Sequence, residues 1–148
     1  MPSVCRLVAL DSTHPASVMA LAQDGSIIGL ALLLTDEAGE VCLDLLCVVP
    51  AYQRQEIATS MVASAVNHLA VMSVKTLSSA YHICNESSRD WHHLFGFVDV
   101  YDQMYIPLKY AWYRDEVWRR DKLGLVDGLD TLKAGRDFWL AQLDERKR

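Results

Sequence analysis

The chain has 148 residues, of which 51% are hydrophobic, and its formal net charge is −5 at pH 7. This length is typical of one domain with a core of its own, and the apolar runs are too short to predict a membrane-spanning helix. The acidic balance disfavours the class of general nucleic-acid binders, which are usually basic.

The N-terminal residues and the cysteines indicate a cytoplasmic protein. The stretch MPSVCRLVALDSTHP holds one Arg and no long apolar core, so we do not expect a signal peptide. Cys5, Cys42, Cys47 and Cys84 lack the spacing of a zinc or redox site, and no metal site is predicted. Buried, reduced thiols are the expectation. Alternation along one strand places Cys42 and Cys47 on opposite faces of a sheet.

The first half of the sequence predicts three strands and a helix. Residues 17–34 form two apolar runs joined by Asp24-Gly25, which is a strong hairpin signal. Residues 35–40 predict a second turn, and residues 41–50 predict a central, nearly all-apolar strand. Pro50 ends that strand because proline lacks the N–H that a sheet ladder needs. Helical spacing follows in a set of apolar residues: Ile57, Met61, Val62, Ala65, Val66 and Leu69.

The second half predicts one more strand, a short helix, a pair of strands and two helices. Residues 74–83 favour a strand, and residues 85–94 favour a helix with Asn85 as its cap and Gly96 at its end. Residues 97–110 predict a final pair of strands. Helices are then predicted for residues 110–122 and 130–148, with one apolar stripe formed by Leu129, Leu132, Trp139 and Leu143.

Two stretches in this order resemble the GNAT superfamily of acyl-CoA-dependent N-acetyltransferases. CVVPAYQRQEIATSMVASAV is similar to its pyrophosphate-loop motif, and NESSRDWHHLFGF is similar to a second motif that opens with Asn and ends with Gly-Phe. The resemblance covers roughly residues 17–108 and implies an α/β (α+β) fold with a mixed, mostly antiparallel central sheet flanked by helices. It implies a GNAT-like acyl-CoA-binding domain at 1–108 and leaves 109–148 as a helical extension.

The same resemblance implies acetyl-CoA as the co-substrate, and it suggests which residues bind it. The pantetheine contacts fall on the backbone of Leu46, Cys47 and Val48. The pyrophosphate falls on the amides at the start of the next helix, where free N–H groups and the helix dipole bind anions. These residues are Gln53, Arg54, Gln55, Glu56, Ile57, Ala58 and Thr59.

Glu56 departs from the family pattern, because glycine stands at this position of the motif. A carboxylate about 6 Å from the phosphates repels them by roughly 0.5–3 kcal/mol, depending on the effective dielectric. The same side chain can instead complement the dipole of the helix. We therefore expect CoA binding that is weakened but not abolished.

His92 and Asp44 are the candidate catalytic residues. By resemblance, His92 takes the place of a tyrosine that protonates the departing thiolate, and the alternative is a solvent-facing His92-His93 pair. Asn85 is expected beside the pantetheine arm, as a helix cap, or in both roles. Asp44 lies in an apolar strand, where burial would raise its pKa as a general base requires; the alternative is a solvated sheet surface.

The helical extension and the acceptor leave alternatives open. Trp112, Trp118 and Trp139 must pack somewhere, either over the sheet or in a homodimer interface. Tyr81 and Tyr105 are expected in aromatic core packing, and a place in the cleft is the alternative. Three functions follow: an N-acetyltransferase acting on a small-molecule or protein amine, a degenerate regulatory or partner-binding module that binds CoA or nothing, and a structural subunit that dimerises through its tail. No nucleic-acid or membrane partner is expected.

Overall fold

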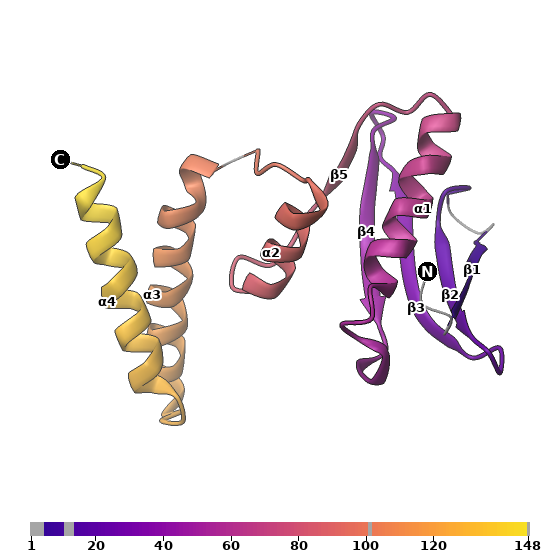
Figure 1. Cartoon of the computed structure of the whole chain (residues 1–148). Coiled ribbons are helices and arrows are strands. Elements are labelled where there is room, and N and C mark those ends of the chain that lie inside the picture. The colour runs from indigo at the N-terminus through magenta and orange to yellow at the C-terminus, as the bar shows by residue number, and fades with distance from the viewer. Residues whose placement is uncertain (1–4, 11–13, 101, 148) are drawn as a thin grey trace. The chain divides into compact units, whose positions relative to one another are not determined.

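The structure is a computed structural model that describes residues 5–10, 14–100 and 102–147. The chain divides into two compact units, Met1–Ala80 and Tyr81–Arg148, and Figure 1 labels the elements of each. Among the described residues, the helices are too short or too polar to cross a membrane. The predicted domains, 1–108 and 109–148, divide the chain at another point, inside one continuous helix.

A five-stranded sheet forms the first unit. Its strands follow one another in the order β1-β2-β3-β4-β5, and every neighbouring pair is antiparallel except β4 and β5, which are parallel. The prediction of a mixed, mostly antiparallel sheet is confirmed. The strands are β1 (Cys5–Ala9), β2 (Val18–Ala22), β3 (Ile27–Thr35), β4 (Val41–Val48) and β5 (Leu77–Ser79).

Helix α1 (Ile57–Val71) packs on one face of this sheet (Figure 1). Its buried residues are Ile57, Met61, Val62, Ala65 and Leu69, as the helical spacing predicts, whereas Val66 is exposed. A Cβ added to Gly29 of β3 would lie 2.9 Å from Met61 Cε, so the absence of a side chain at Gly29 lets α1 approach the sheet. The core between α1 and the sheet also contains Val18, Ala20, Ala31, Leu33, Val41 and Leu43.

A β-bulge interrupts β4 at Asp44. Leu33 lies opposite Leu43 and Leu32 lies opposite Leu45, so Asp44 is an extra residue with no partner in β3. Pairing between β4 and β5 ends at Leu43. From Asp44 onward, β4 therefore has β3 on one side and, within the described residues, no strand paired to its other edge.

The bulge corrects the prediction for the cysteines. Cys42 lies opposite Leu34 and Cys47 lies opposite Leu30, and these two leucines are four residues apart on β3. Residues four apart on a regular strand share a face, so Cys42 and Cys47 lie on the same face and the prediction of opposite faces is wrong. The expected burial is wrong as well, because Cys47 is exposed and the other three thiols are half-buried.

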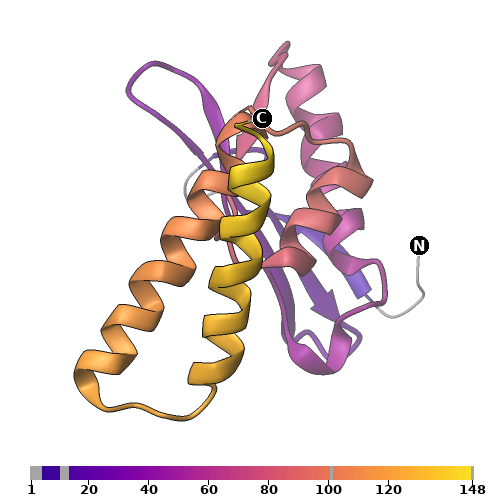
Figure 2. The same ribbon diagram turned by 90° about the vertical axis from the view of Figure 1, so that its left-hand side faces the viewer.

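The second unit consists of helices. The termini of the first, α2, are as predicted: Asn85 Oδ1 accepts a 3.0 Å bond from Ser88 N, and Gly96 has a left-handed φ of 114° that ends the helix. Helices α3 and α4 run antiparallel side by side in Figures 1 and 2 and are called here the C-terminal hairpin. The elements are α2 (Glu86–Phe95), a short 3-10 helix at Asp102–Met104, α3 (Tyr105–Leu123) and α4 (Leu129–Glu145).

The predicted pair of strands at 97–110 is wrong, because residues 97–100 form no strand and residues 102–110 are helical. The 3-10 helix and the first residues of α3 occupy that segment; Tyr101 lies outside the described residues. Pro107 is the third residue of α3 and lies in its first turn. Amides of a first turn have no acceptor within the helix, so a proline there removes no helical hydrogen bond. The strand predicted at 74–83 exists, but it is shorter, at Leu77–Ser79.

The C-terminal hairpin is packed through aromatic side chains. A Cβ at Gly135 would overlap the Tyr113 ring, so this glycine lets α3 and α4 approach closely. The predicted stripe on α4 faces inward, because Leu129 is buried and Leu132, Trp139 and Leu143 are half-buried. Trp118 is 64% exposed in the single chain, which leaves the predicted alternative of a homodimer interface open.

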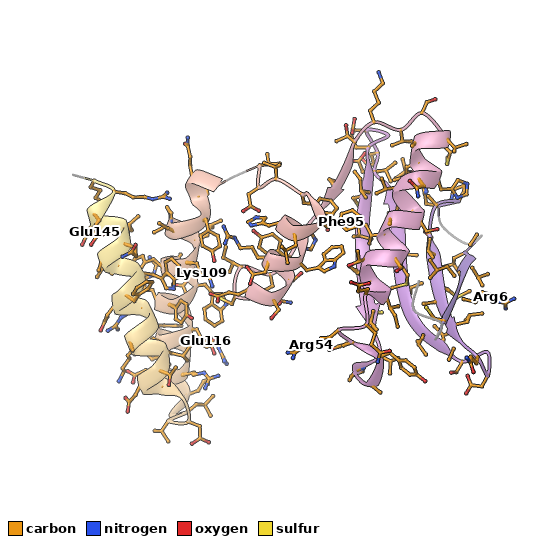
Figure 3. All side chains as sticks on the ribbon, in the orientation of Figure 1. Arg6, Arg54, Phe95, Lys109, Glu116 and Glu145 are labelled. Carbon is orange, nitrogen blue, oxygen red and sulfur yellow. The ribbon has the colours of Figure 1, made fainter. Side chains whose placement is uncertain are left out.

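A buried lysine ties the hairpin to α2. Lys109, labelled in Figure 3, is 1% exposed, and its Nζ donates to Glu86 Oε1 at 2.9 Å. The ammonium also lies 5.8 Å from the Tyr105 ring and 5.5 Å from the Trp139 ring. Burial alone would lower the pKa of Lys109, but the bond to Glu86 and the neighbouring groups outweigh it and raise the pKa.

Candidate functional site

The loop at residues 49–56 joins β4 to α1 and is tied back to its own backbone. Pro50–Tyr52 form one turn of 3-10 helix, and Gln53 N donates to Pro50 O at 3.3 Å. The Gln53 side chain donates to Val48 O at 3.0 Å, and Gln55 Nε2 donates to Ala51 O at 3.3 Å. These bonds fold the loop back onto itself and onto the end of β4.

Two residues of this loop have a left-handed backbone. Arg54 and Glu56 both have φ near 60°, a conformation in which a Cβ crowds the following carbonyl at a cost of about 1–2 kcal/mol. Glycine has no Cβ and avoids that cost. The position where the motif holds glycine thus has the backbone that glycine favours, although Glu56 occupies it. The Arg54 side chain projects from the same turn (Figure 3).

Helix α1 begins without a side-chain cap. Glu56 precedes the helix, makes no capping hydrogen bond with its carboxylate, and the first turn of α1 contains no acidic residue. The amides of Ile57 and Ala58 have no acceptor one turn earlier within the helix, whereas Ser60 N donates to Glu56 O at 2.9 Å. This terminus therefore presents donors and a positive dipole end to an anion.

The open edge of β4 lies directly before this loop. Leu46, Cys47 and Val48 pair with Ala31, Leu30 and Gly29 of β3. Pairing with β5 ends at Leu43, so backbone groups on the far edge of β4 are available to an extended ligand. The pantetheine contacts expected at Leu46, Cys47 and Val48 stay a prediction.

Asp44 lies at the bulge where the open edge begins. Its side chain is exposed, and so is Leu45 beside it. The expectation of a buried carboxylate is therefore wrong, and the alternative of a solvated sheet surface describes its position. A role for Asp44 as a base no longer gains support from burial.

His92 occupies a buried position on α2. It is 5% exposed, and its Nδ1 lies 2.6 Å from the carbonyl oxygen of Ser88. A ring nitrogen that bonds a carbonyl oxygen must donate, so Nδ1 carries a hydrogen in this arrangement. The predicted alternative of a solvent-facing pair applies to His93 alone, whose side chain is 37% exposed.

Aromatic rings surround the imidazole of His92 within the same unit. The ring centroids of Tyr81, Trp91 and Phe97 lie 5.4, 5.0 and 5.1 Å from that of His92. Tyr81 is half-buried and packs against this imidazole. These contacts hold the imidazole ring in one orientation.

Sequence reasoning missed Asp99. Its carboxylate accepts bonds from the Tyr81 hydroxyl at 2.7 Å and from His93 Nε2 at 2.8 Å, and it lies 3.5 Å from Arg89. The Tyr81 hydroxyl bond, followed by His93 and the Arg89 charge, outweighs desolvation and lowers the pKa of Asp99. An aspartate between two valines gave no signal of this network, because its three partners lie elsewhere in the sequence.

The structure places the predicted site residues in two groups. The residues of β4 and of the loop lie together in the first unit, whereas Asn85 and His92 lie on α2 in the second. Asn85 is exposed and caps α2. Within the described residues, His, Cys, Asp and Glu form no cluster of three that could hold a metal ion.

Comparisons with known proteins point to one family. The family model described as acetyltransferase (GNAT) family matches residues 4–97. The fold is similar to that of the aminoglycoside N-acetyltransferase AAC(6')-Iy in complex with CoA, with 23% identity and a TM-score of 0.51, over 56% of this chain and 67% of that one. A GNAT-family acetyltransferase from Staphylococcus aureus Mu50 gives 13% identity and a TM-score of 0.54, over 59% of this chain and 55% of that one.

A further structure of AAC(6')-Iy, in complex with a bisubstrate analogue, gives 23% identity and a TM-score of 0.50 over 56% of this chain. The chain spans 61% of that protein, so it corresponds to only part of the relatives it matches. At these identities the likeness shows the fold. No curated protein matches the chain.

Replacing Glu56 by glycine is expected to stabilise the fold. Glu56→Gly relieves about 1–2 kcal/mol of left-handed strain, and the extra freedom of the unfolded chain offsets roughly 0.4–1 kcal/mol of that gain. The free energy of unfolding, measured by urea titration, should rise. Gln55→Gly is the matched control: among the described residues of this loop only Arg54 and Glu56 have a positive φ, so this variant should lose stability. Equal losses in both variants would contradict the assignment of strain.

Proposed function

Because this chain belongs to the acetyltransferase (GNAT) family, we propose that it is an N-acetyltransferase that transfers an acetyl group from acetyl-CoA to an amine. One observation carries the proposal: the open edge of β4 leads through a tied loop into a helix N-terminus without a side-chain cap. An extended thiol arm needs backbone partners, and a pyrophosphate needs amide donors. The first unit supplies both in consecutive segments of chain.

In this proposal, the amides after Arg54 hold the pyrophosphate. Glu56 places a carboxylate among them, and Arg54 offsets part of its charge. The backbone of Leu46, Cys47 and Val48 holds the pantetheine arm in the first unit. The contact expected of Asn85, which caps α2 in the second unit, stays a prediction. The related AAC(6')-Iy was solved in complex with CoA, which supports acetyl-CoA as the co-substrate.

The transfer forms a C–N bond and breaks a C–S bond. The neutral amine attacks the thioester carbonyl, and backbone N–H groups of β4 stabilise the oxyanion. The attacking nitrogen then loses a proton, for which Asp44 is the proposed acceptor. The proposed proton source for the departing CoA thiolate is Nε2–H of His92 in its imidazolium form. The Nδ1 hydrogen stays bonded to the Ser88 carbonyl, so the ring that remains is the neutral Nδ1–H tautomer.

A second candidate function is a module that binds CoA without catalysis. Two observations favour it: a carboxylate stands at the phosphate-binding turn, and Asp44 lacks the burial expected of a base. Such a module binds CoA but produces no free thiol with any amine. Titration combined with a turnover assay separates the two functions.

The proposed acceptor is a small-molecule or peptide amine. The relatives described above differ from this chain too much to indicate which amine, and the acidic net charge of −5 attracts cations in general. We place the protein in the cytoplasm, a compartment that keeps exposed thiols such as Cys47 reduced.

Acetyl-CoA is expected to bind weakly, and Glu56→Gly is expected to tighten binding about tenfold, since it removes both the repelling charge and the Cβ. Isothermal titration calorimetry measures both affinities. Glu56→Gln separates the effect of charge from that of the backbone, and Glu37→Gln, in an exposed turn, removes the same charge elsewhere. Absence of heat at millimolar acetyl-CoA, or weaker binding by Glu56→Gly, would disprove the assignment of this loop.

His92→Phe is expected to lower kcat about 100-fold, the range of a lost general acid, while the affinity for CoA stays nearly constant. Release of free thiol from acetyl-CoA, followed with a panel of aminoglycosides and peptide N-termini, gives the rate. His68→Phe, at an exposed position on α1, is the matched control. An unchanged kcat in His92→Phe would leave the histidine a purely structural role.

We further propose that the C-terminal hairpin forms a homodimer. Trp118 and Phe138 are 64% and 55% exposed on its surface, and aromatic residues are enriched at interfaces. Sedimentation velocity should show a dimer whose dissociation constant rises at least tenfold in Trp118→Arg. Lys122→Gln, at an exposed position of the same helix, is the control. A monomer at all concentrations tested would rule out the dimer.

A further inference from the structure

The Asp99 carboxylate connects three segments of chain around α2. Tyr81 comes from the segment before the helix, His93 and Arg89 come from the helix, and Asp99 itself comes from the segment after it. Two of the contacts are short hydrogen bonds, at 2.7 and 2.8 Å, and they use different carboxylate oxygens. Each oxygen therefore has its own donor, which fixes the carboxylate in rotation as well as in position.

The hydrogen bonds and charges of this network affect the protonation of Asp99 and Tyr81. The hydroxyl bond from Tyr81, together with His93 and Arg89, lowers the pKa of Asp99. Burial and the bond to Asp99 raise the pKa of Tyr81. The carboxylate therefore stays ionised and the phenol stays protonated near neutral pH, so the contact persists there. Arg89 is held in place from a second side, with its guanidinium 4.2 Å from the centre of the Tyr105 ring.

The two segments that Asp99 joins also contact His92 from outside α2. The Tyr81 ring lies 5.4 Å from the imidazole, and the ring of Phe97, two residues before Asp99, lies 5.1 Å from it. Ser88, one turn earlier on α2, holds Nδ1. Loss of the Asp99 contact would free both rings to move away from the imidazole, which would let the imidazole rotate off the Ser88 carbonyl.

We propose that Asp99 is a positioning residue for His92: by tying Tyr81 to the segment that carries Phe97, it holds the imidazole in the orientation in which Nδ1 donates to the Ser88 carbonyl. This inference rests on the proposed function for its catalytic consequence. Its structural content, one fixed tautomer and ring orientation, stands independently of any reaction. Asp99 itself touches no reacting atom in this scheme.

Asp99→Asn tests the proposal, because an amide keeps the shape of the side chain but has one acceptor oxygen instead of two. Nitrogen-15 spectra of the imidazoles, recorded at about pH 8.5, above the ordinary histidine pKa, report which ring nitrogen carries the hydrogen. The wild-type His92 should show the single Nδ1–H tautomer, and Asp99→Asn should show a mixture of tautomers. Asp90→Asn, at an exposed position of α2, is the matched control and should leave the spectrum unchanged.

Kinetics provide the second readout. Asp99→Asn should lower kcat about tenfold, since small misplacements of a catalytic group cost up to about 100-fold, and it should leave KM for acetyl-CoA within about twofold. Tyr81→Phe keeps the ring and removes the hydroxyl; it should shift the His92 spectrum in the same direction, and it replaces Asp99→Asn if that variant does not fold.

The outcomes separate the two hypotheses. Mixed tautomers in Asp99→Asn without turnover by the wild-type protein on any amine would refute the proposed function and leave the positioning role intact. An unchanged His92 spectrum in folded Asp99→Asn or in Tyr81→Phe would overturn the inference, whatever the activity. A rise in KM with constant kcat would also overturn it, because that pattern marks lost substrate binding.

Discussion

A carboxylate inside an apolar strand is the constraint on which the first unit depends. The free-energy cost of burying an unpaired charge far exceeds the stabilisation that one apolar side chain of the strand provides, yet Leu43 beside Asp44 belongs to the core. The bulge resolves the conflict by giving Asp44 a position with no partner in β3, where its side chain is exposed while Leu43 stays buried. The alternation shifts by one residue beyond this point, and pairing with β5 ends just before it. The open edge needed by an extended ligand thus begins at a residue that the core excludes.

In the loop after β4, the backbone of Glu56 suits an anion-binding turn, whereas its side chain does not. The backbone at Glu56 is left-handed, as in a turn built for glycine, and Glu56 does not cap the amides of the following helix with its side chain. Both features suit an anion. The carboxylate of Glu56 opposes the anion electrostatically, and its Cβ strains the backbone by about 1–2 kcal/mol. The turn keeps its geometry because its bonds, from Gln53 to Val48 and from Gln55 to Ala51, come from other residues.

Hydrophobic periodicity and helix-capping residues predicted much of the fold. They failed where a single inserted residue shifts the alternation of a strand. Local residue patterns determine three features: the hairpin at Asp24-Gly25, the buried face of α1 and both ends of α2. These patterns can be recognised in the sequence alone. The bulge at Asp44 depends on pairing with β3, and a one-residue insertion reverses which face each later side chain occupies. Residues 105–110 contain the aromatic and branched side chains of a strand, but Pro107 suits a first helical turn, and Lys109 gains its partner Glu86 only in α3.

The candidate site follows the same division between local and distant causes. The loop residues could be predicted because one short motif supplies both the turn and the helix N-terminus. His92 could be predicted from its spacing after Asn85, but its state could not, because the Ser88 carbonyl, the Tyr81 ring and the Phe97 ring determine it together. Asp99 lies outside every motif and still joins the segments that carry two of these contacts. In the proposed function, His92 would donate from Nε2 while Nδ1 keeps its hydrogen on the Ser88 carbonyl, so the proposed role depends on the residues on both sides of α2 that contact the ring.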